Sequence, residues 1–116
     1  MLAKKLLLSN ADFKKRFKRV VSSPHFVVRV THNELGHNRF GVIISAKVNS
    51  KSTQRHRLKR FILAEVKSWP SWSRDLILVV LGQLVDLSGR EIANELALLK
   101  DELIRLFSIS SNDSNL

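Results

Sequence analysis

The clearest hydrophobic pattern lies in the second half of the chain. Residues 75–81 form a nearly continuous apolar run, which is typical of a strand buried on both faces. Ser88 followed by Glu91 resembles a capping box, which predicts a helix that begins there and runs to about Phe107. Residues 108–116 are polar and predict a frayed tail. Along the predicted helix, apolar residues recur at helical spacing and should cover a sheet: Ile92, Leu96, Leu99, Leu103 and Leu106.

The first half of the chain predicts one helix followed by two strands. A cap at Ser9 or Asn10 predicts a helix that continues to about residue 21. β-Branched residues favour strands over 25–31 and 39–45, and the polar residues between them predict a turn. We therefore expect these two strands to form a hairpin.

A second helix is predicted over about residues 52–68, capped by Ser52 or Thr53. Residues 46–49 leave room for one more strand. The resulting order is helix, strand, strand, an optional strand, helix, strand, helix. This order predicts an α+β fold, a two-layer sandwich with helices packed on a small mixed sheet. The length suits one domain over residues 1–116.

Positive charge is concentrated in the first part of the chain. Residues 1–67 contain 16 Lys and Arg against three acidic residues, a net of +13, whereas residues 68–116 contain four against seven, a net of −3. This segregation favours a polyanionic partner, with nucleic acid preferred over an anionic membrane surface. The lack of cysteine excludes disulfides and thiolate metal sites. No apolar run approaches the ~20 residues of a membrane span, and no signal peptide is visible, so we expect a cytoplasmic protein with no membrane partner.

The predicted helix over residues 52–68 is both amphipathic and basic. At about 100° per residue its apolar positions share one side: Leu58, Phe61 and Ile62, together with Glu65. Basic residues lie opposite or beside this stripe: Arg55, His56, Arg57, Lys59, Arg60 and Lys67. Such a helix can dock on the core and place guanidinium groups against phosphates, because the planar fork of arginine binds two oxygens at once. A solvated basic face is the alternative, but no acidic residue is near enough in sequence to pair with these cations.

A second basic cluster surrounds two aromatic residues near the N-terminus. Phe13 and Phe17 are spaced to share one face of the predicted first helix. The cations of the cluster are interleaved with them: Lys14, Lys15, Arg16, Lys18 and Arg19. This arrangement suits single-stranded RNA, because bases stack on rings while phosphates meet Lys and Arg. Two phenylalanines at helical spacing can also belong to the core, and both interpretations stay open.

Three motifs follow one another in a defined order. Asp12-Phe13 precedes a second aromatic, Phe17; residues 41–47 read Gly-Val-Ile-Ile-Ser-Ala-Lys; and residues 55–60 read Arg-His-Arg-Leu-Lys-Arg. Their order and spacing resemble the bacterial ribonuclease P protein component. That family has an acid–Phe pair with a second aromatic, a strand ending in Gly-apolar-x-apolar-Ser-x-Lys, and a basic Arg-Asn-Arg-type motif on a helix. The resemblance covers roughly residues 6–107.

The resemblance implies an RNA-binding subunit of a ribonucleoprotein endonuclease, which hydrolyses the 5′ leader from precursor tRNA during tRNA processing. Its partners would be ribonuclease P RNA and precursor tRNA, with no obligate protein partner. Residues on the basic helix and before it would bind the catalytic RNA: Ser45, Lys47, Arg55, His56, Arg57, Lys59 and Arg60. The leader would lie in a cleft between the sheet and the first helix, lined by Phe13, Lys14, Phe17, Val27 and Arg29. Mg²⁺ is expected in the RNA-containing holoenzyme, and the protein alone is expected to bind none.

The sequence contains no visible catalytic constellation of its own. Its four histidines lack metal-ligand spacing with a third donor, and Ser45 has no obvious base. We therefore expect a protein subunit without an active site. Two other functions remain open. A ribosomal-type or other structural RNA-binding protein of similar fold would present one RNA surface only, and a basic module for DNA or membranes would show no preference for RNA.

Overall fold

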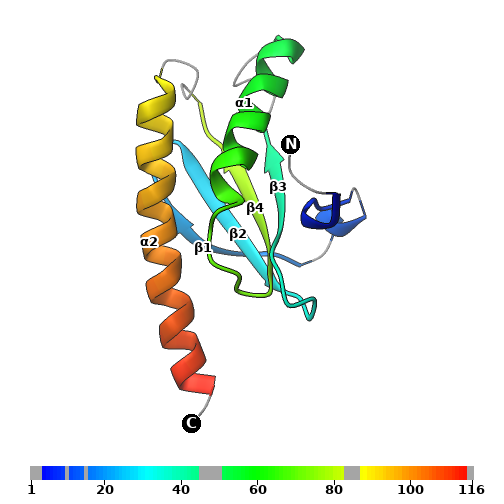
Figure 1. Cartoon of the computed structure of the whole chain (residues 1–116), viewed down its shortest axis with the longest axis vertical. Coiled ribbons are helices and arrows are strands. Elements are labelled where there is room, and N and C mark those ends of the chain that lie inside the picture. The colour runs from blue at the N-terminus through cyan, green and yellow to red at the C-terminus, as the bar shows by residue number, and fades with distance from the viewer. Residues whose placement is uncertain (1–3, 10, 15, 45–50, 83–86, 115–116) are drawn as a thin grey trace.

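The computed structural model describes residues 4–9, 11–14, 16–44, 51–82 and 87–114 (Figure 1). Two short 3₁₀ helices come first, η1 (Lys4–Leu6) and η2 (Asp12–Lys14). The strands are β1 (Lys18–Ser22), β2 (Phe26–His32), β3 (Arg39–Ile43) and β4 (Arg74–Val80). The α-helices are α1 (Ser52–Val66), between β3 and β4, and α2 (Gly89–Ser114), after β4.

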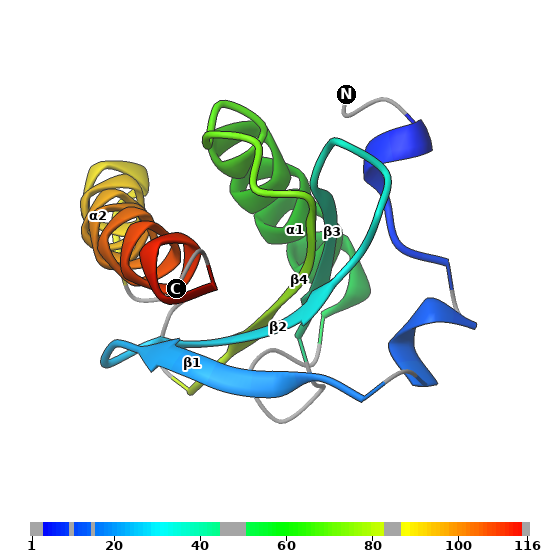
Figure 2. The ribbon, with the colours of Figure 1, turned by 90° about the horizontal axis from the view of Figure 1, so that it is seen from below.

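The four strands form one mixed sheet in the order β1-β2-β4-β3. β2 pairs antiparallel with both β1 and β4, whereas β3 pairs parallel with β4. A parallel pair needs a crossover connection, and here α1 provides it. Figure 2 shows both α-helices on the same face of the sheet, with no α-helix on the other face. The predicted α+β class, with helices packed on a small mixed sheet, is confirmed.

The core lies between the sheet and the two helices, because alternate strand residues point toward them. β2 contributes Phe26, Val28 and Val30, and β4 contributes Leu76, Leu78 and Val80. The helices supply Ile62 and Val66 from α1, and Ile92, Leu96, Leu99 and Leu103 from α2. Ile77 of β4 is also buried, on the other face. β4 is therefore buried on both faces, as its continuous apolar run predicted.

The predicted hairpin between the strands at 25–31 and 39–45 is wrong. Both strands exist, as β2 and β3, but β4 lies between them and pairs with each. The reason is burial, because the most apolar strand gains most from the central position, where both of its faces are covered. The actual hairpin joins β1 to β2 through a tight turn, in which the Ser23 amide donates to the Phe26 carbonyl at 2.8 Å.

The helix predicted over residues 10–21 is also wrong. The described part of this segment contains the short η2 and then β1. Val20 and Val21 are β-branched and favour a strand. Pairing of β1 with β2 then provides hydrogen-bond partners for the backbone groups of β1. Ser9 does cap η2, because the Asp12 amide donates to its Oγ at 3.3 Å and Asp12 Oδ2 accepts from the Ser9 amide at 2.8 Å.

The two remaining helices begin where the sequence predicted. The capping box of α2 is confirmed, because the Glu91 amide donates to Ser88 Oγ and the Ser88 amide donates to Glu91 Oε1, both at 3.2 Å. For α1 the cap is Lys51, without a side-chain hydrogen bond, and not Ser52 or Thr53. The optional strand at 46–49 lies outside the described residues.

The predicted end of α2 near Phe107 is wrong, because the helix continues to Ser114. Phe107 still packs against the body of the protein, with its ring 4.9 Å from that of Trp72 and 5.1 Å from the Arg74 guanidinium. Leu106, predicted to cover the sheet, is instead among the exposed hydrophobic residues.

Candidate RNA interface

Helix α1 presents its cations on the sides that do not face the core. Ile62 and Val66 are fully buried and fix the helix on the sheet. Arg55 is half-buried, and the other predicted RNA-binding residues of α1 are exposed: His56, Arg57, Lys59 and Arg60. The described part of α1 has Glu65 as its one acidic residue, on the predicted apolar side. The outward surface of α1 is therefore strongly positive.

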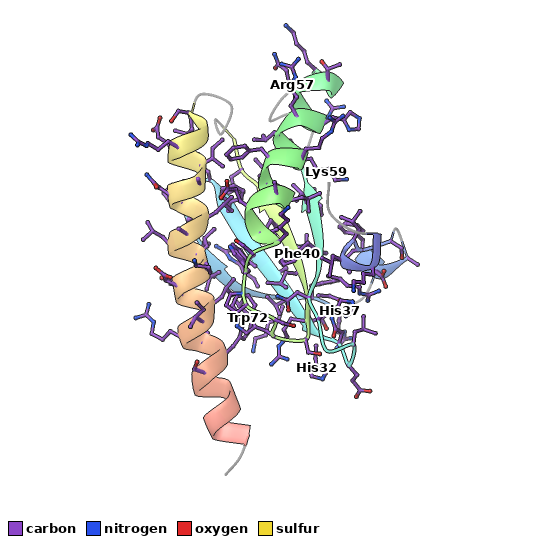
Figure 3. All side chains as sticks on the ribbon, in the orientation of Figure 1. His32, His37, Phe40, Arg57, Lys59 and Trp72 are labelled. Atoms are coloured by element: carbon purple, nitrogen blue, oxygen red, sulfur yellow. The ribbon has the colours of Figure 1, made fainter. Side chains whose placement is uncertain are left out.

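These cations do not all point the same way. Figure 3 shows Lys59 on the side of α1 toward β3 and the N-terminal segment, and Arg57 near the start of the helix on another side. His56, Lys59, Arg60 and Lys67 line a groove of about 750 Å³, and Arg57 is not among its lining residues. Arg57 thus lies outside the groove that His56, Lys59 and Arg60 of the same motif line.

The opposite wall of this groove is apolar and comes from the N-terminal segment and the edge of β3. Leu7 forms a parallel bridge with Phe40, and the Leu8 amide donates to the Phe40 carbonyl at 2.9 Å. The Phe13 ring lies directly against Gly41, where a Cβ would come within 2.4 Å of the ring. These residues line the groove together with Leu63 and Ala64 of α1.

Arg39 fixes the N-terminal segment electrostatically. Its guanidinium donates to both carboxylate oxygens of buried Asp75, at 2.9 and 2.7 Å, and reaches Asp12 at 3.3 Å. The hydrogen bond to Asp75 raises the pKa of Arg39, and this outweighs the opposing effect of burial. Asn33 also donates to Asp75, at 2.8 Å. His37, labelled in Figure 3, has its Nε2 3.2 Å from the Lys5 carbonyl oxygen, a contact that ties η1 to the β2–β3 turn.

The face of the sheet away from the helices forms a second surface, called here the open face. Val27 and Arg29 of β2 point to it, because Phe26, Val28 and Val30 point into the core. Val27 pairs with Val79, which pairs with Ile43, an exposed residue. On the next row Arg29 is exposed and pairs with Arg19. The open face therefore combines apolar residues with arginines.

The residues predicted for a leader cleft are only partly brought together. Val27 and Arg29 share the open face, whereas Phe13 lies over Gly41, two strands away from Arg29 in the same row. Among the described residues, the short η2 and β1 stand where the first helix was predicted to form a wall of the cleft. Phe17 is half-buried and precedes β1. The side chain of Lys14, and all of Ser45 and Lys47, lie outside what the structure describes.

The apolar wall of the groove was not predicted from the sequence. Leu7, Leu8 and Ala64 belong to no recognisable sequence motif. The one signal in the sequence was Gly41, which has no side chain and so leaves room on the strand for the ring of Phe13. Lys67 was predicted to lie on the basic side of the helix but not to be a binding residue, and it lines the groove.

A cluster at the other side of the molecule joins the β1–β2 turn to α2. Glu95 accepts hydrogen bonds from the Ser23 hydroxyl and, at 2.9 Å, from the His25 amide, and His25 Nδ1 lies 2.7 Å from its other oxygen. Burial raises the pKa of Glu95, but the hydrogen bonds from Ser23 and His25 lower it by more, so the net shift is downward. All three residues are bonded within the cluster, which gives it a structural role.

Within the described ranges, no three of His, Asp and Glu come together in a way that could hold a metal ion. The described helices include none that is both long and apolar enough to cross a membrane.

The fold and these surfaces define a small, basic α+β protein with two faces suited to a polyanion. Residues 1–103 match the family model described as Ribonuclease P, and the chain therefore belongs to the ribonuclease P protein family. It is a protein subunit of the ribonuclease P ribonucleoprotein, an RNA-binding protein of tRNA processing whose partner is ribonuclease P RNA. A comparison with curated proteins found no match.

Solved structures support the same assignment. The Staphylococcus aureus RNase P protein is 26% identical, covers 88% of this chain and 97% of its own, and superposes with a TM-score of 0.73. A mutant of that protein described as defective in mRNA degradation is 27% identical, with coverage of 81% and 84% and a TM-score of 0.71. The RNase P protein from Thermotoga maritima, at 21% identity, coverage of 78% and 86% and a TM-score of 0.66, shares the fold.

Proposed function

We propose that this chain is a non-catalytic subunit that holds ribonuclease P RNA on α1 and the 5′ leader of precursor tRNA on the open face of the sheet. The observation that carries the proposal is the exposed row of cations on a helix whose other side is locked into the core. Because Ile62 and Val66 are fully buried, the helix that carries the guanidinium and ammonium groups is fixed on the sheet before RNA arrives. Preorganised cations of this kind suit phosphates.

Arg57 and Arg60 are the residues to which we assign most of the contact with the catalytic RNA. Both are exposed, and an arginine fork binds two phosphate oxygens at once. We extend the same assignment to Arg55, His56 and Lys59. Ser45 and Lys47 remain candidates from the family motif alone.

We assign the leader to Val27, Arg29 and their neighbours on the open face. A single strand binds where bases find apolar or aromatic surface and phosphates find cations, and the open face offers both. Phe13 lies over Gly41 at the β3 end of this surface, and we assign Phe17 and Lys14 to the leader from their positions in the chain alone. The groove beside α1 shares Phe13 and Gly41 with the β3 end of this surface.

Two described carboxylates of the N-terminal segment and β4 are engaged in structural ion pairs. Asp12 and Asp75 are both bonded to Arg39. The described part of the chain offers no ligand cluster for Mg²⁺, so we propose that the RNA binds the metal and we assign no chemical step to the protein. We further propose that the chain acts as one domain and works in the cytoplasm, where its RNA partners are processed.

Reconstitution tests the proposal. The protein is added to a bacterial ribonuclease P RNA and a precursor tRNA with a leader of several nucleotides, and cleavage is measured at low Mg²⁺. The wild-type chain should raise the cleavage rate, and Arg57→Glu and Arg60→Glu should each reduce the effect. For each variant, the slope of log affinity against log salt should fall by about one, as expected for the loss of one phosphate contact.

Arg105→Glu is the matched control, because Arg105 is an exposed arginine on α2 and the change in charge is the same. It should leave stimulation intact. Wild-type protein that fails to stimulate cleavage would contradict the proposal, as would equal losses for the α1 and α2 variants. Shortening the leader to one nucleotide should remove the benefit of Arg29 and leave that of Arg57, which separates the two surfaces.

A further inference from the structure

A second pocket, called here the α2 pocket, lies where α2 passes the loop between α1 and β4. Its volume is about 570 Å³, within the range of small-molecule sites, roughly 300–1,000 Å³. It is lined by Gly36 of the β2–β3 turn, by residues 71–74, and by Phe107 and Ser108 of α2. None of these residues lines the groove beside α1. Figure 3 shows Trp72 between α2 and the sheet, well away from Arg57, so the α2 pocket is separate from the basic surface of α1.

Hydrogen bonds hold the walls of the α2 pocket in place. The buried Asn38 accepts through its Oδ1 from the amides of Trp72 and Arg74, at 2.8 and 3.3 Å. The Ser71 hydroxyl donates to the Gly36 carbonyl at 3.0 Å, which ties the loop to the β2–β3 turn. A site whose walls are already ordered loses little conformational entropy when a ligand binds.

The backbone at Ser73 is strained. Its φ is 54°, and Ser73 is the one non-glycine residue with positive φ among the described residues. A side chain makes this left-handed conformation costly, and such strain is concentrated at functional sites. Asn33 holds the conformation, because its amide donates to the Ser73 carbonyl and its Oδ1 accepts from the Ser73 hydroxyl, both at 3.1 Å. The turn that leads into Arg74 is therefore fixed before any ligand binds.

Arg74 supplies the positive charge of the α2 pocket. Its Nη1 donates to His32 Nδ1 at 2.9 Å and to the carbonyls of Trp72 and Ser73 at 3.1 and 3.5 Å. All three acceptors are neutral, and no carboxylate of the described residues pairs with this guanidinium. Because Nη1 alone makes these contacts, the hydrogens on Nε and Nη2 remain for a ligand.

The edge formed by Nε and Nη2 is suited to a carboxylate, and the fold contains an example. Arg39 uses these same two nitrogens to hold both carboxylate oxygens of Asp75, at 2.9 and 2.7 Å. Such a bidentate pair is stronger than a single neutral hydrogen bond and fixes the orientation of the carboxylate. Arg74 thus offers a ligand the geometry that Arg39 offers Asp75.

Two aromatic rings stand beside the guanidinium of Arg74. The ring centroids of Trp72 and Phe107 are 4.9 Å apart, and the Arg74 guanidinium lies 5.1 Å from the Phe107 ring. Both aromatic side chains are half-buried and line the pocket. Aromatic pairs at this spacing are favourable, so the ring of a ligand can extend the cluster.

We infer that the α2 pocket binds a small aromatic acid, with one carboxylate on the Nε–Nη2 edge of Arg74 and its ring against Trp72 and Phe107. One cation among the lining residues matches one negative charge. A polyanion is disfavoured, since residues 68–116 hold four Lys and Arg against seven acidic residues and the exposed Glu34 stands on the β2–β3 turn. The inference goes beyond the proposed function, because this ligand is not RNA.

Titration of the full chain, followed by amide resonances in NMR, tests the inference. The probe is indole-3-acetate; indole-3-acetamide lacks its charge, and acetate lacks its ring. Indole-3-acetate should shift the amides of Gly36, Trp72 and Ser108 and bind at least about tenfold more tightly than either control, because it alone makes both contacts. No shift of these amides at millimolar probe, equal affinity for the acid and the amide, or tighter binding of AMP at the same amides would overturn the inference.

Two substitutions remove different parts of the α2 pocket. Arg74→Gln removes the charge, and its matched control is Arg105→Gln at an exposed arginine of α2. Ser108→Trp fills the pocket from an exposed position without a change in charge, and its control is Ala97→Trp, also exposed on α2. Both pocket variants should weaken binding of indole-3-acetate about tenfold or more, and both controls should bind it like the wild type. If Arg74→Gln fails to fold, Ser108→Trp decides alone, and equal affinities for Ser108→Trp and Ala97→Trp would contradict the inference.

A peptide probe identifies the source of the ligand. An acetylated tryptophan–aspartate dipeptide amide carries the same ring and carboxylate within a polypeptide. Tighter binding of the dipeptide assigns the ligand to a segment of a partner protein, and tighter binding of indole-3-acetate assigns it to a free aromatic acid. Both results support the shared chemistry.

The reconstituted ribonucleoprotein separates this inference from the proposed function. Ser108→Trp should leave the stimulation of cleavage unchanged while it removes binding of indole-3-acetate. A loss of stimulation in this variant would place the α2 pocket in the RNA interface and overturn the inference. A wild-type chain that binds the probe but does not stimulate cleavage would contradict the proposed function alone.

Discussion

Replacement of Asp75 by asparagine should reveal how strongly the fold depends on one buried carboxylate. Asp75 is completely buried and accepts hydrogen bonds from Arg39 and Asn33. Asparagine keeps the shape but removes the charge and turns one acceptor into an NH₂ group that faces a donor. Breaking a buried ion pair from one side costs about 3–5 kcal/mol. The Arg39 side chain is 19% exposed and keeps Asp12, so we expect the lower end, about 3 kcal/mol.

The matched comparison is Asp12→Asn. Its two contacts with Arg39 are 3.3 Å long, and the Asp12 side chain is 15% exposed, so its loss should cost at most about 1 kcal/mol. Urea unfolding followed by circular dichroism at neutral pH measures both. With a slope of about 2 kcal/mol per molar urea, Asp75→Asn should lower the midpoint by about 1.5 M. Equal losses for the two variants, or a loss below about 1 kcal/mol for Asp75→Asn, would refute this account of the cluster.

Three further predictions concern the attachment of α2. Burial raises the pKa of Glu95 but its hydrogen bonds lower it by more, so its stabilising effect is complete above the unfolded pKa and is lost as pH falls through the folded pKa. Glu95→Gln should therefore flatten the acid side of a stability–pH curve measured by urea midpoints, and an unchanged curve would contradict the pKa shift. Ser88→Ala should lower the free energy of unfolding by about 1 kcal/mol in the same assay, because the capping box is lost. An unchanged free energy would mean that the cap does not stabilise α2. Leu103→Ala, at a fully buried site, should cost about 2–5 kcal/mol. The control is Leu98→Ala, at a residue 68% exposed, which should change the free energy of unfolding by no more than about 0.5 kcal/mol. Similar losses of stability for both variants would mean that α2 packs through another face.

The helix α1 was predictable because its signal is local. The spacing of Phe61 and Ile62 identifies a buried side, and the positions of the cations follow from helical geometry alone. The capping box at Ser88 is local in the same sense. Each depends on residues within one or two turns of each other, so no distant contact was needed to find them.

The first helix was mispredicted because a local pattern competed with a distant partner. Phe13 and Phe17 have helical spacing, but Arg19 and Val21 pair with β2, which the spacing cannot reveal. Phe13 itself is held by Gly41, on a strand far along the chain. The same limit applies to the groove, whose walls meet only after the N-terminal segment docks on the edge of β3.

The strand order held one clue that the hairpin prediction overlooked. A strand that is apolar at nearly every position needs cover on both faces and belongs in the centre of the sheet. Residues 75–81, which include most of β4, fit that description. β2 and β3 should therefore each pair with β4 and not with each other. This argument recovers the order β2-β4-β3 from the sequence but does not reveal β1 at the edge.

The central place of β4 has a consequence for synthesis of the chain on the ribosome. β2 and β3 have no ladder with each other, so a nascent chain that ends before Arg74 lacks the strand that joins them. The basic helix is complete by Val66 but has no finished sheet to rest on until Val80 has emerged. Non-local pairing of this kind delays folding. We therefore expect the growing chain to be a loose polycation for most of its synthesis, and to gain its ordered RNA-binding faces in one late step.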